Sequence, residues 1–134
     1  MTREGPLGVA LAAIAVGAVA GAWARWGLAY WLNPRLGALP LGTLAANVIG
    51  GYLVGIAAAI FMAHPGLAPA WRLLFITGFL GGLTTFSTFS AESVVFLQGA
   101  RWGAALLHIG LHLFGSIAAT VAGIATVRLL TPGS

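Results

Sequence analysis

The chain has 134 residues, of which 60% are hydrophobic and 6% are charged, whereas an ordinary soluble domain has about 25% charged residues. Its six arginines are scattered along the chain and are accompanied by two glutamates, Glu4 and Glu92, so no basic patch for binding nucleic acid is indicated. The absence of cysteine excludes disulfides and thiolate metal sites. This composition predicts an integral membrane protein.

Uncharged runs follow one another along the chain, and each approaches or exceeds the ~18 residues that span a hydrocarbon core of ~30 Å. Residues typical of turns, chiefly proline, glycine and asparagine, separate them. The sequence therefore predicts an all-α membrane protein with one transmembrane domain, residues 1–134. Its four predicted helices cover about 7–32, 40–63, 71–97 and 102–129.

Small residues recur four apart in three of these spans and form Gly-x-x-x-Gly faces. Such faces let helix backbones approach closely, so they predict tight packing between helices. The pairs are Gly17 and Gly21, Gly51 and Gly55, and Gly78 and Gly82.

Polar residues in the second and fourth spans also lie one helical turn apart. Thr43 and Asn47 share a face of the second span, while the fourth span repeats a polar residue every four positions. A polar side chain in a bilayer needs a partner in the bundle or a wet cavity. The stripes therefore predict a polar path between the helices. The stripe on the fourth span consists of His108, His112, Ser116 and Thr120.

The third span contains the run GGLTTFSTF, residues 81–89, in which hydroxyls and two phenylalanines follow a glycine pair. Hydroxyls donate hydrogen bonds without carrying charge, and Phe86 and Phe89 offer the positive edges of their rings, so this region suits a small anion. A helix that breaks inside the membrane frees carbonyl groups, which suit a cation such as Na⁺. We predict a break near residues 81–85.

The arginines divide evenly between the two sides that four spans predict, three on each. Arg3, Arg72 and Arg128 fall on one side, and Arg25, Arg35 and Arg101 on the other. No positive-inside bias results, which favours insertion in both orientations and an antiparallel dimer. The alternative is that such short loops carry too few charges to set an orientation.

The run at residues 81–89, preceded by Gly78-Phe79 and followed by Glu92, resembles the signature of the Fluc (CrcB) family of fluoride channels. Two further elements agree with it: Gly42-Thr43-x-x-x-Asn47 in the second span and Gly21-x-x-x-Arg25-Trp26 in the first. The resemblance covers the whole chain in length, number of spans and order of motifs.

The resemblance implies a multi-pass protein of the cell (inner or plasma) membrane that exports toxic fluoride from the cytoplasm by passive electrodiffusion and confers fluoride resistance. It implies a dual-topology antiparallel homodimer in the lipid bilayer, with two pores and a third helix broken at mid-membrane. By the same resemblance the backbone carbonyls of Gly81 and Thr84 hold a structural Na⁺ at the centre of the dimer, and Arg25 and Glu92 belong to a vestibule. The implied fluoride pathway consists of Thr43, Asn47, Phe86, Ser87, Thr88, Phe89, His112 and Ser116.

The fourth span departs from the family pattern, because many relatives carry Asn and Ser where this chain has His108 and His112. Three interpretations remain open. The pair binds a metal, or it is simply hydrogen-bonded, or His112 replaces a pore hydroxyl as an N–H donor. In the last case the His112 ring is able to become protonated at mildly acidic pH, since an unperturbed histidine has a pKa of ~6.5.

Other classes of membrane protein fit the sequence less well. A small proton-coupled multidrug exporter needs a membrane-embedded carboxylate, for which Glu92 is the only candidate. A structural subunit does not need the polar stripes. An intramembrane enzyme is not indicated, because the chain has no paired carboxylates and no cofactor motif.

Overall fold

The computed structural model describes residues 5–33 and 39–132, and these residues are arranged as long helices and short connections. Arg3 and Arg35, two of the arginines that bear on the predicted orientation, lie outside them. Within the described residues, four helical segments are long and apolar enough to cross a membrane, as the sequence predicts. The elements are α1 (Leu7–Leu32), α2 (Leu41–Ala63), α3 (Pro69–Arg72), η2 (Leu73–Leu80), α4 (Gly81–Leu83), α5 (Phe86–Gln98) and α6 (Trp102–Leu130).

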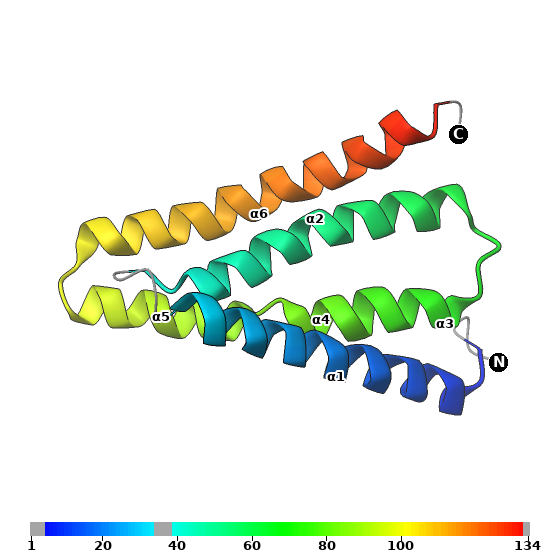
Figure 1. Ribbon diagram of the computed structural model, residues 1–134, viewed down its shortest axis with the longest axis horizontal. Coiled ribbons are helices and arrows are strands. Elements are labelled where there is room, and N and C mark those ends of the chain that lie inside the picture. Colours follow the sequence, from blue (N-terminus) through cyan, green and yellow to red (C-terminus); the bar gives the residue numbers. More distant parts are fainter. Residues whose placement is uncertain (1–4, 34–38, 133–134) are drawn as a thin grey trace.

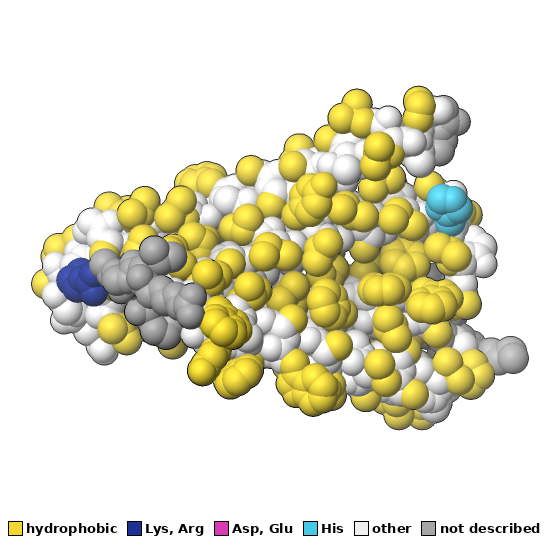
Figure 2. Space-filling view, viewed as in Figure 1, with side chains coloured by type: hydrophobic (Ala, Val, Ile, Leu, Met, Phe, Trp, Pro, Cys, Tyr) yellow, Lys and Arg dark blue, Asp and Glu magenta, His cyan; other side chains and the backbone are white. Residues whose placement is uncertain are grey.

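Each of the four segments runs antiparallel to the one before it, so α1 begins and α6 ends at the same end of the molecule (Figure 1). The short elements from α3 to α5 follow one another along one line and make up the third segment. α1 packs against η2 and α4, and α2 packs against α6. Hydrophobic side chains cover most of the face in Figure 2, and the coloured basic and histidine side chains lie near its two ends. A bilayer around the middle of the bundle accounts for this distribution.

Glycines bring the paired helices into close backbone contact. A Cβ atom on Gly78 of η2 would lie 2.7 Å from the carbonyl oxygen of Ile14 on α1, and one on Gly51 of α2 would lie 2.8 Å from that of Ser116 on α6. Real Cβ atoms essentially never come closer than 3.0 Å to such atoms. The close packing predicted from the Gly-x-x-x-Gly faces is therefore confirmed.

The third segment is interrupted next to its glycine pair. η2 is π-helical, α4 ends at Leu83, and α5 begins at Phe86. The two residues between them have extended backbones, with φ −83° and ψ 152° at Thr84 and φ −150° and ψ 115° at Thr85. The amide of Thr84 still donates to the carbonyl of Leu80 at 2.9 Å, as in a helix. The amide of Thr85 has no such helical bond, so the backbone groups of Thr85 need other partners.

The glycine contacts predict a difference between two substitutions on α6. A Cβ atom on Gly123 would meet the backbone of α2 at Tyr52 and would lie 3.0 Å from the amide nitrogen of Ile56, whereas one on Gly110 would meet nothing within 4 Å. We expect Gly123→Ala to destabilise the protein by about 1–3 kcal/mol through overpacking. Gly110→Ala should be neutral or slightly stabilising, because alanine is the better helix former. Thermal unfolding in detergent measures both, and equal shifts would contradict the packing described here.

Candidate functional site

The interruption in the third segment is paired by one side chain of α2. The amide of Thr85 donates to Asn47 Oδ1 at 2.7 Å, and Asn47 Nδ2 donates to the carbonyl oxygen of Thr85 at 3.1 Å. An unpaired backbone group in a bilayer costs several kcal/mol. Asn47 therefore supplies both hydrogen bonds that the extended Thr85 cannot make within a helix. Because the backbone N–H can only donate and the carbonyl can only accept, these bonds also fix the orientation of the Asn47 amide.

That orientation determines which nitrogen of His112 carries hydrogen. The second amide hydrogen of Asn47 points to Nδ1 of His112, 3.0 Å away. Nδ1 must accept this bond, so the ring carries its hydrogen on Nε2. Nε2 is buried and has no hydrogen-bond partner among the described residues. His112 therefore presents an N–H donor to the interior of the bundle, while both amide hydrogens of Asn47 are already engaged.

Thr85 also begins α5. Its Oγ1 accepts from the amide of Thr88 at 3.1 Å, the usual contact of a helix N-cap. The same Oγ1 donates to the hydroxyl of Thr88 at 3.0 Å and lies 3.2 Å from that of Ser87. The N-terminus of α5, which carries the positive end of the helix dipole, thus opens at the interruption among hydroxyl groups.

The carbonyl groups of Gly81 and Thr84 are among those that lose their helical donors at the same place. In an unbroken α-helix the amides of Thr85 and Thr88 would donate to the carbonyls of Gly81 and Thr84. Here those amides donate to Asn47 Oδ1 and Thr85 Oγ1 instead. The carbonyls of Gly81 and Thr84 are therefore released from the helical ladder, and they are oxygen atoms of the kind that bind Na⁺.

A cavity of about 680 Å³ lies beside the interruption, between the third segment, α2 and α6. Phe86 is 79% exposed at this cavity. Phe89 is partly buried, with its ring centroid 5.6 Å from that of Phe86 and 4.7 Å from that of His112. Among the predicted site residues, those that line this cavity are Asn47, Gly81, Thr84, Phe86, Phe89, His112 and Ser116.

A second cavity, of about 280 Å³, lies among α1, α2 and α5. Thr43 and Glu92 meet there, where Thr43 Oγ1 donates to Glu92 Oε1 at 2.6 Å. Arg25 also lines it, and its Nε donates to the carbonyl of Gly82 at 2.9 Å. Thr85 lines both cavities and so lies between them. The remaining predicted site residue at this second cavity is Thr88, whereas Ser87 is exposed and lines neither of the two.

Two residues, Thr85 and His108, make contacts at the site that the sequence does not predict. Thr85 pairs with Asn47 and caps α5, and the signal that could have identified it as a cap is a threonine directly before a helical run. His108 is 2% exposed and its Nε2 lies 3.4 Å from Glu92 Oε2. No spacing rule relates residues on different helices, so this second contact has no signal in the sequence.

These features define a multi-pass membrane protein of four spans, with a polar interruption in the third. Residues 12–124 match the family model described as CrcB-like protein, Camphor Resistance (CrcB), and the chain belongs to this family. The resemblance noted in the sequence is thereby confirmed.

Similar curated proteins cover nearly the whole chain. The fluoride-specific ion channel FluC of Cupriavidus necator is 60% identical over 126 residues, which are 94% of this chain and 98% of that protein. The proteins of the same name from Cupriavidus pinatubonensis and Pseudomonas putida are 56% and 58% identical over 126 and 121 residues. These matches cover 94% and 90% of this chain, and 98% and 95% of the two relatives.

The Asn47 contacts predict a large effect on stability. Asn47→Ala removes both partners of the Thr85 backbone, and we expect it to destabilise the protein by about 2 kcal/mol or more, because each buried polar group left unpaired costs about 1–3 kcal/mol. Thr84→Val is the matched control at the same interruption. The Thr84 hydroxyl donates only to the carbonyl of Leu80, one turn back. Thermal unfolding in detergent should show a much smaller shift for this control, and similar shifts would contradict the role of Asn47.

Proposed function

We propose that this protein is a fluoride-selective ion channel that exports toxic fluoride from the cytoplasm by passive electrodiffusion, and that it is not an enzyme. The relatives named as fluoride-specific ion channels support this proposal across nearly the whole chain. The observation that carries it is the interruption at Thr84 and Thr85, which opens the N-terminus of α5 at a cavity lined by Phe86, Phe89 and His112.

The first cavity suits an anion without offering it a full positive charge. The ring edges of Phe86 and Phe89 and the N-terminus of α5 all present partial positive charge there, and His112, whose Nε2–H is enclosed within the bundle, lines the same cavity. Fluoride holds its water more tightly than chloride does, so several donors must replace that water together. A constriction with many weak donors therefore favours fluoride, whereas a wide site with one arginine favours the larger anion.

The pathway continues from the first cavity to the second past Thr85. In this proposal the hydroxyls of Ser87 and Thr88 extend the row of donors, and Ser116 joins it from α6. Thr43, Arg25 and Glu92 then belong to the vestibule at the second cavity. Because both amide hydrogens of Asn47 are engaged, we expect Asn47 to act by holding His112 and the Thr85 backbone in place beside the first cavity.

We also propose that two chains form an antiparallel, dual-topology homodimer with two pores, and that the helix break lies at mid-membrane. Thr84 is the sixteenth of the thirty residues from Pro69 to Gln98, which supports a central position. The equal numbers of arginines on the two predicted sides support insertion in both orientations. The released carbonyls of Gly81 and Thr84, with those of the second copy, would hold a structural Na⁺ that neutralises their partial charges.

Fluoride efflux tests the proposal. Liposomes that contain the purified protein are loaded with potassium fluoride or potassium chloride, valinomycin is added, and ion-selective electrodes follow the external anions. We expect rapid fluoride efflux without chloride efflux. Phe86→Ile and Asn47→Asp should each slow fluoride efflux by about tenfold or more, equivalent to about 1.4 kcal/mol.

Phe114→Ile is the matched control, because Phe114 is 71% exposed on α6 and lies outside the residues that line the two cavities. Its efflux should equal that of the unchanged protein. If well-folded protein releases neither anion, the channel proposal is wrong, and proton-coupled drug export through Glu92 becomes the next function to test.

The dimer and its cation are tested without fluoride. Replacing Na⁺ by N-methylglucamine should lower the thermal stability of the dimer in detergent and increase the monomer fraction in size-exclusion chromatography, because the freed carbonyls lose their partner. Restoring Na⁺ should reverse both changes. A dimer whose stability does not respond to Na⁺ would remove the cation from the proposal, and a monomer under all conditions would remove the dimer.

A further inference from the structure

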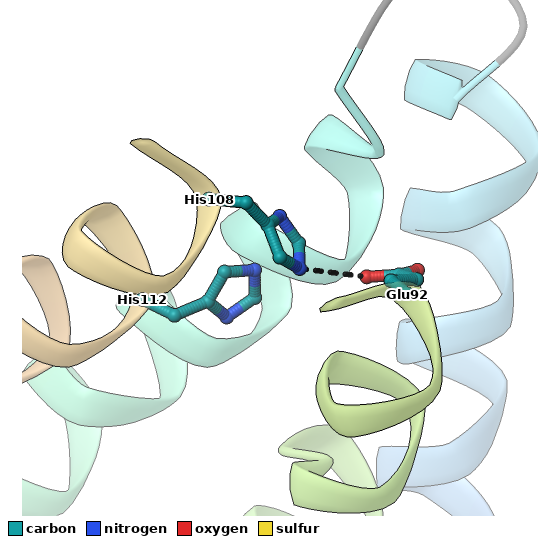
Figure 3. A group of neighbouring side chains, drawn as sticks. All are labelled: Glu92, His108 and His112. Atoms are coloured by element: carbon teal, nitrogen blue, oxygen red, sulfur yellow. Dashed lines mark ion pairs between the residues drawn. The ribbon is translucent and has the colours of Figure 1, made fainter. Parts of the chain in front are cut away.

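Three ionisable side chains from two helices meet inside the bundle. His108 and His112 lie one turn apart on α6 and point toward Glu92 on α5 (Figure 3). One ligand atom from each of the three lies within 4.8 Å of the others. His108 and His112 are 2% and 5% exposed, so this cluster is enclosed by protein.

The polar atoms at the centre of this cluster are not satisfied by the rest of the described chain. Glu92 Oε2, His108 Nε2 and His112 Nε2 are buried and make no hydrogen bond there. By contrast, the outer atoms Glu92 Oε1 and His112 Nδ1 accept from Thr43 and Asn47 at 2.6 and 3.0 Å. Glu92 Oε2 and His108 Nε2 come within ion-pair distance of each other at 3.4 Å but form no hydrogen bond, and His112 Nε2 has no hydrogen-bond partner among the described residues. Buried polar groups are almost always hydrogen-bonded, so three such atoms that face one another indicate a missing ligand.

We propose that Glu92, His108 and His112 bind a divalent transition-metal ion, with Zn²⁺ as the best fit. Two histidines four residues apart on one helix face are an established arrangement for Zn²⁺, and a carboxylate commonly adds the third ligand. Zn²⁺ binds nitrogen and oxygen at about 2.0–2.2 Å, which places tetrahedral ligands about 3.4 Å apart. Glu92 Oε2 and His108 Nε2 are already 3.4 Å apart.

The metal and the Asn47 hydrogen bond compete for His112. Without metal, Nδ1 accepts from Asn47 and Nε2 carries the hydrogen. To coordinate through Nε2, the ring must move that hydrogen to Nδ1, where it faces the hydrogen of the Asn47 amide. The amide cannot turn over to accept it, because both of its ends are paired with Thr85. Metal binding therefore breaks the Asn47–His112 hydrogen bond and removes the Nε2–H donor of His112.

This coupling has a consequence for transport that rests on the proposed function. His112 lines the first cavity, and Glu92 lines the second. A metal ion bound to both residues has an open fourth position, at which it would hold water or a fluoride ion. Bound Zn²⁺ should thus inhibit fluoride efflux, both by withdrawing the His112 donor and by retaining the anion.

Isothermal titration of Zn²⁺ into the full-length protein, purified without a polyhistidine tag, tests the site directly. We expect one Zn²⁺ per chain, with no comparable binding of Mg²⁺, which does not favour imidazole. His108→Gln and Glu92→Gln should each weaken Zn²⁺ binding by more than about tenfold, since even residues that only orient a ligand are worth about that much. Glu92→Gln retains an oxygen that can accept from Thr43, so it also serves where a histidine variant folds poorly.

His64→Gln is the matched control, because His64 is the one histidine of the sequence outside the cluster and is exposed beyond the end of α2. The chain has no cysteine to compete for the metal. The control should bind Zn²⁺ as the unchanged protein does. Absence of Zn²⁺ binding, or binding that survives in both His108→Gln and Glu92→Gln, would overturn the proposal.

The tautomer change gives a second, independent measurement. Nitrogen-15 NMR of histidine-labelled protein should show His112 with hydrogen on Nε2 before Zn²⁺ is added and on Nδ1 afterwards, with His64 unchanged. A His112 ring that keeps its hydrogen on Nε2 at saturating Zn²⁺ would exclude Nε2 as the ligand and overturn the proposed coordination.

Efflux measurements then separate the two proposals. If Zn²⁺ binds and slows fluoride efflux in the unchanged protein and His64→Gln but not in Glu92→Gln, both proposals are supported. If Zn²⁺ binding depends on the three residues but the metal-free protein conducts no fluoride, the metal site stands and the channel function fails. If efflux is rapid but substitution of the three residues does not weaken Zn²⁺ binding, the channel function is supported and the metal site is not.

Discussion

The pairing of Asn47 with the backbone of Thr85 is the interaction on which the rest of the site depends. In a bilayer no water is present to bond an open backbone, so a helix can be interrupted only where protein groups replace the lost partners. Here one side chain of α2 does so with two hydrogen bonds of 2.7 and 3.1 Å. The interruption in turn exposes the N-terminus of α5 and releases carbonyls of the opposite partial charge. One local interruption thereby places the positive end of a helix dipole and carbonyl oxygens close together.

The orientation of the Asn47 amide also determines a hydrogen bond to α6. Because Thr85 leaves the Asn47 amide no freedom, His112 must accept at Nδ1 and present its Nε2–H toward His108 and Glu92. Glu92 is held from its other side by Thr43, one turn before Asn47 on α2. Contacts from helices α2 and α5 therefore act together on His112 of α6, and they determine on which of its nitrogens the hydrogen lies.

Close helix packing makes these contacts possible. Glycines let α1 lie against η2 and α4, where Arg25 reaches the carbonyl of Gly82. Glycines also let α2 lie against α6, so that Asn47 and His112 come within 3.0 Å. A larger residue at these positions would separate the helices and lengthen the hydrogen bonds between them, which weaken steeply with distance and misalignment. The small residues thus serve the polar site as well as the apolar core.

The sequence by itself determined the class of protein, the four spans, the close-packed glycine faces and the family. These features are local or periodic: membrane thickness sets the length of an apolar run, and helix geometry sets the spacing of the glycines. It also indicated which residues carry polar chemistry in the spans, including Asn47, His112 and Glu92. Only the tertiary structure decided which of them meet, for example that Asn47 pairs with Thr85, and that Glu92 faces His108 and His112. The physical reason is that such partners lie on different helices, whose relative rotation and depth follow from packing and not from any spacing along the chain.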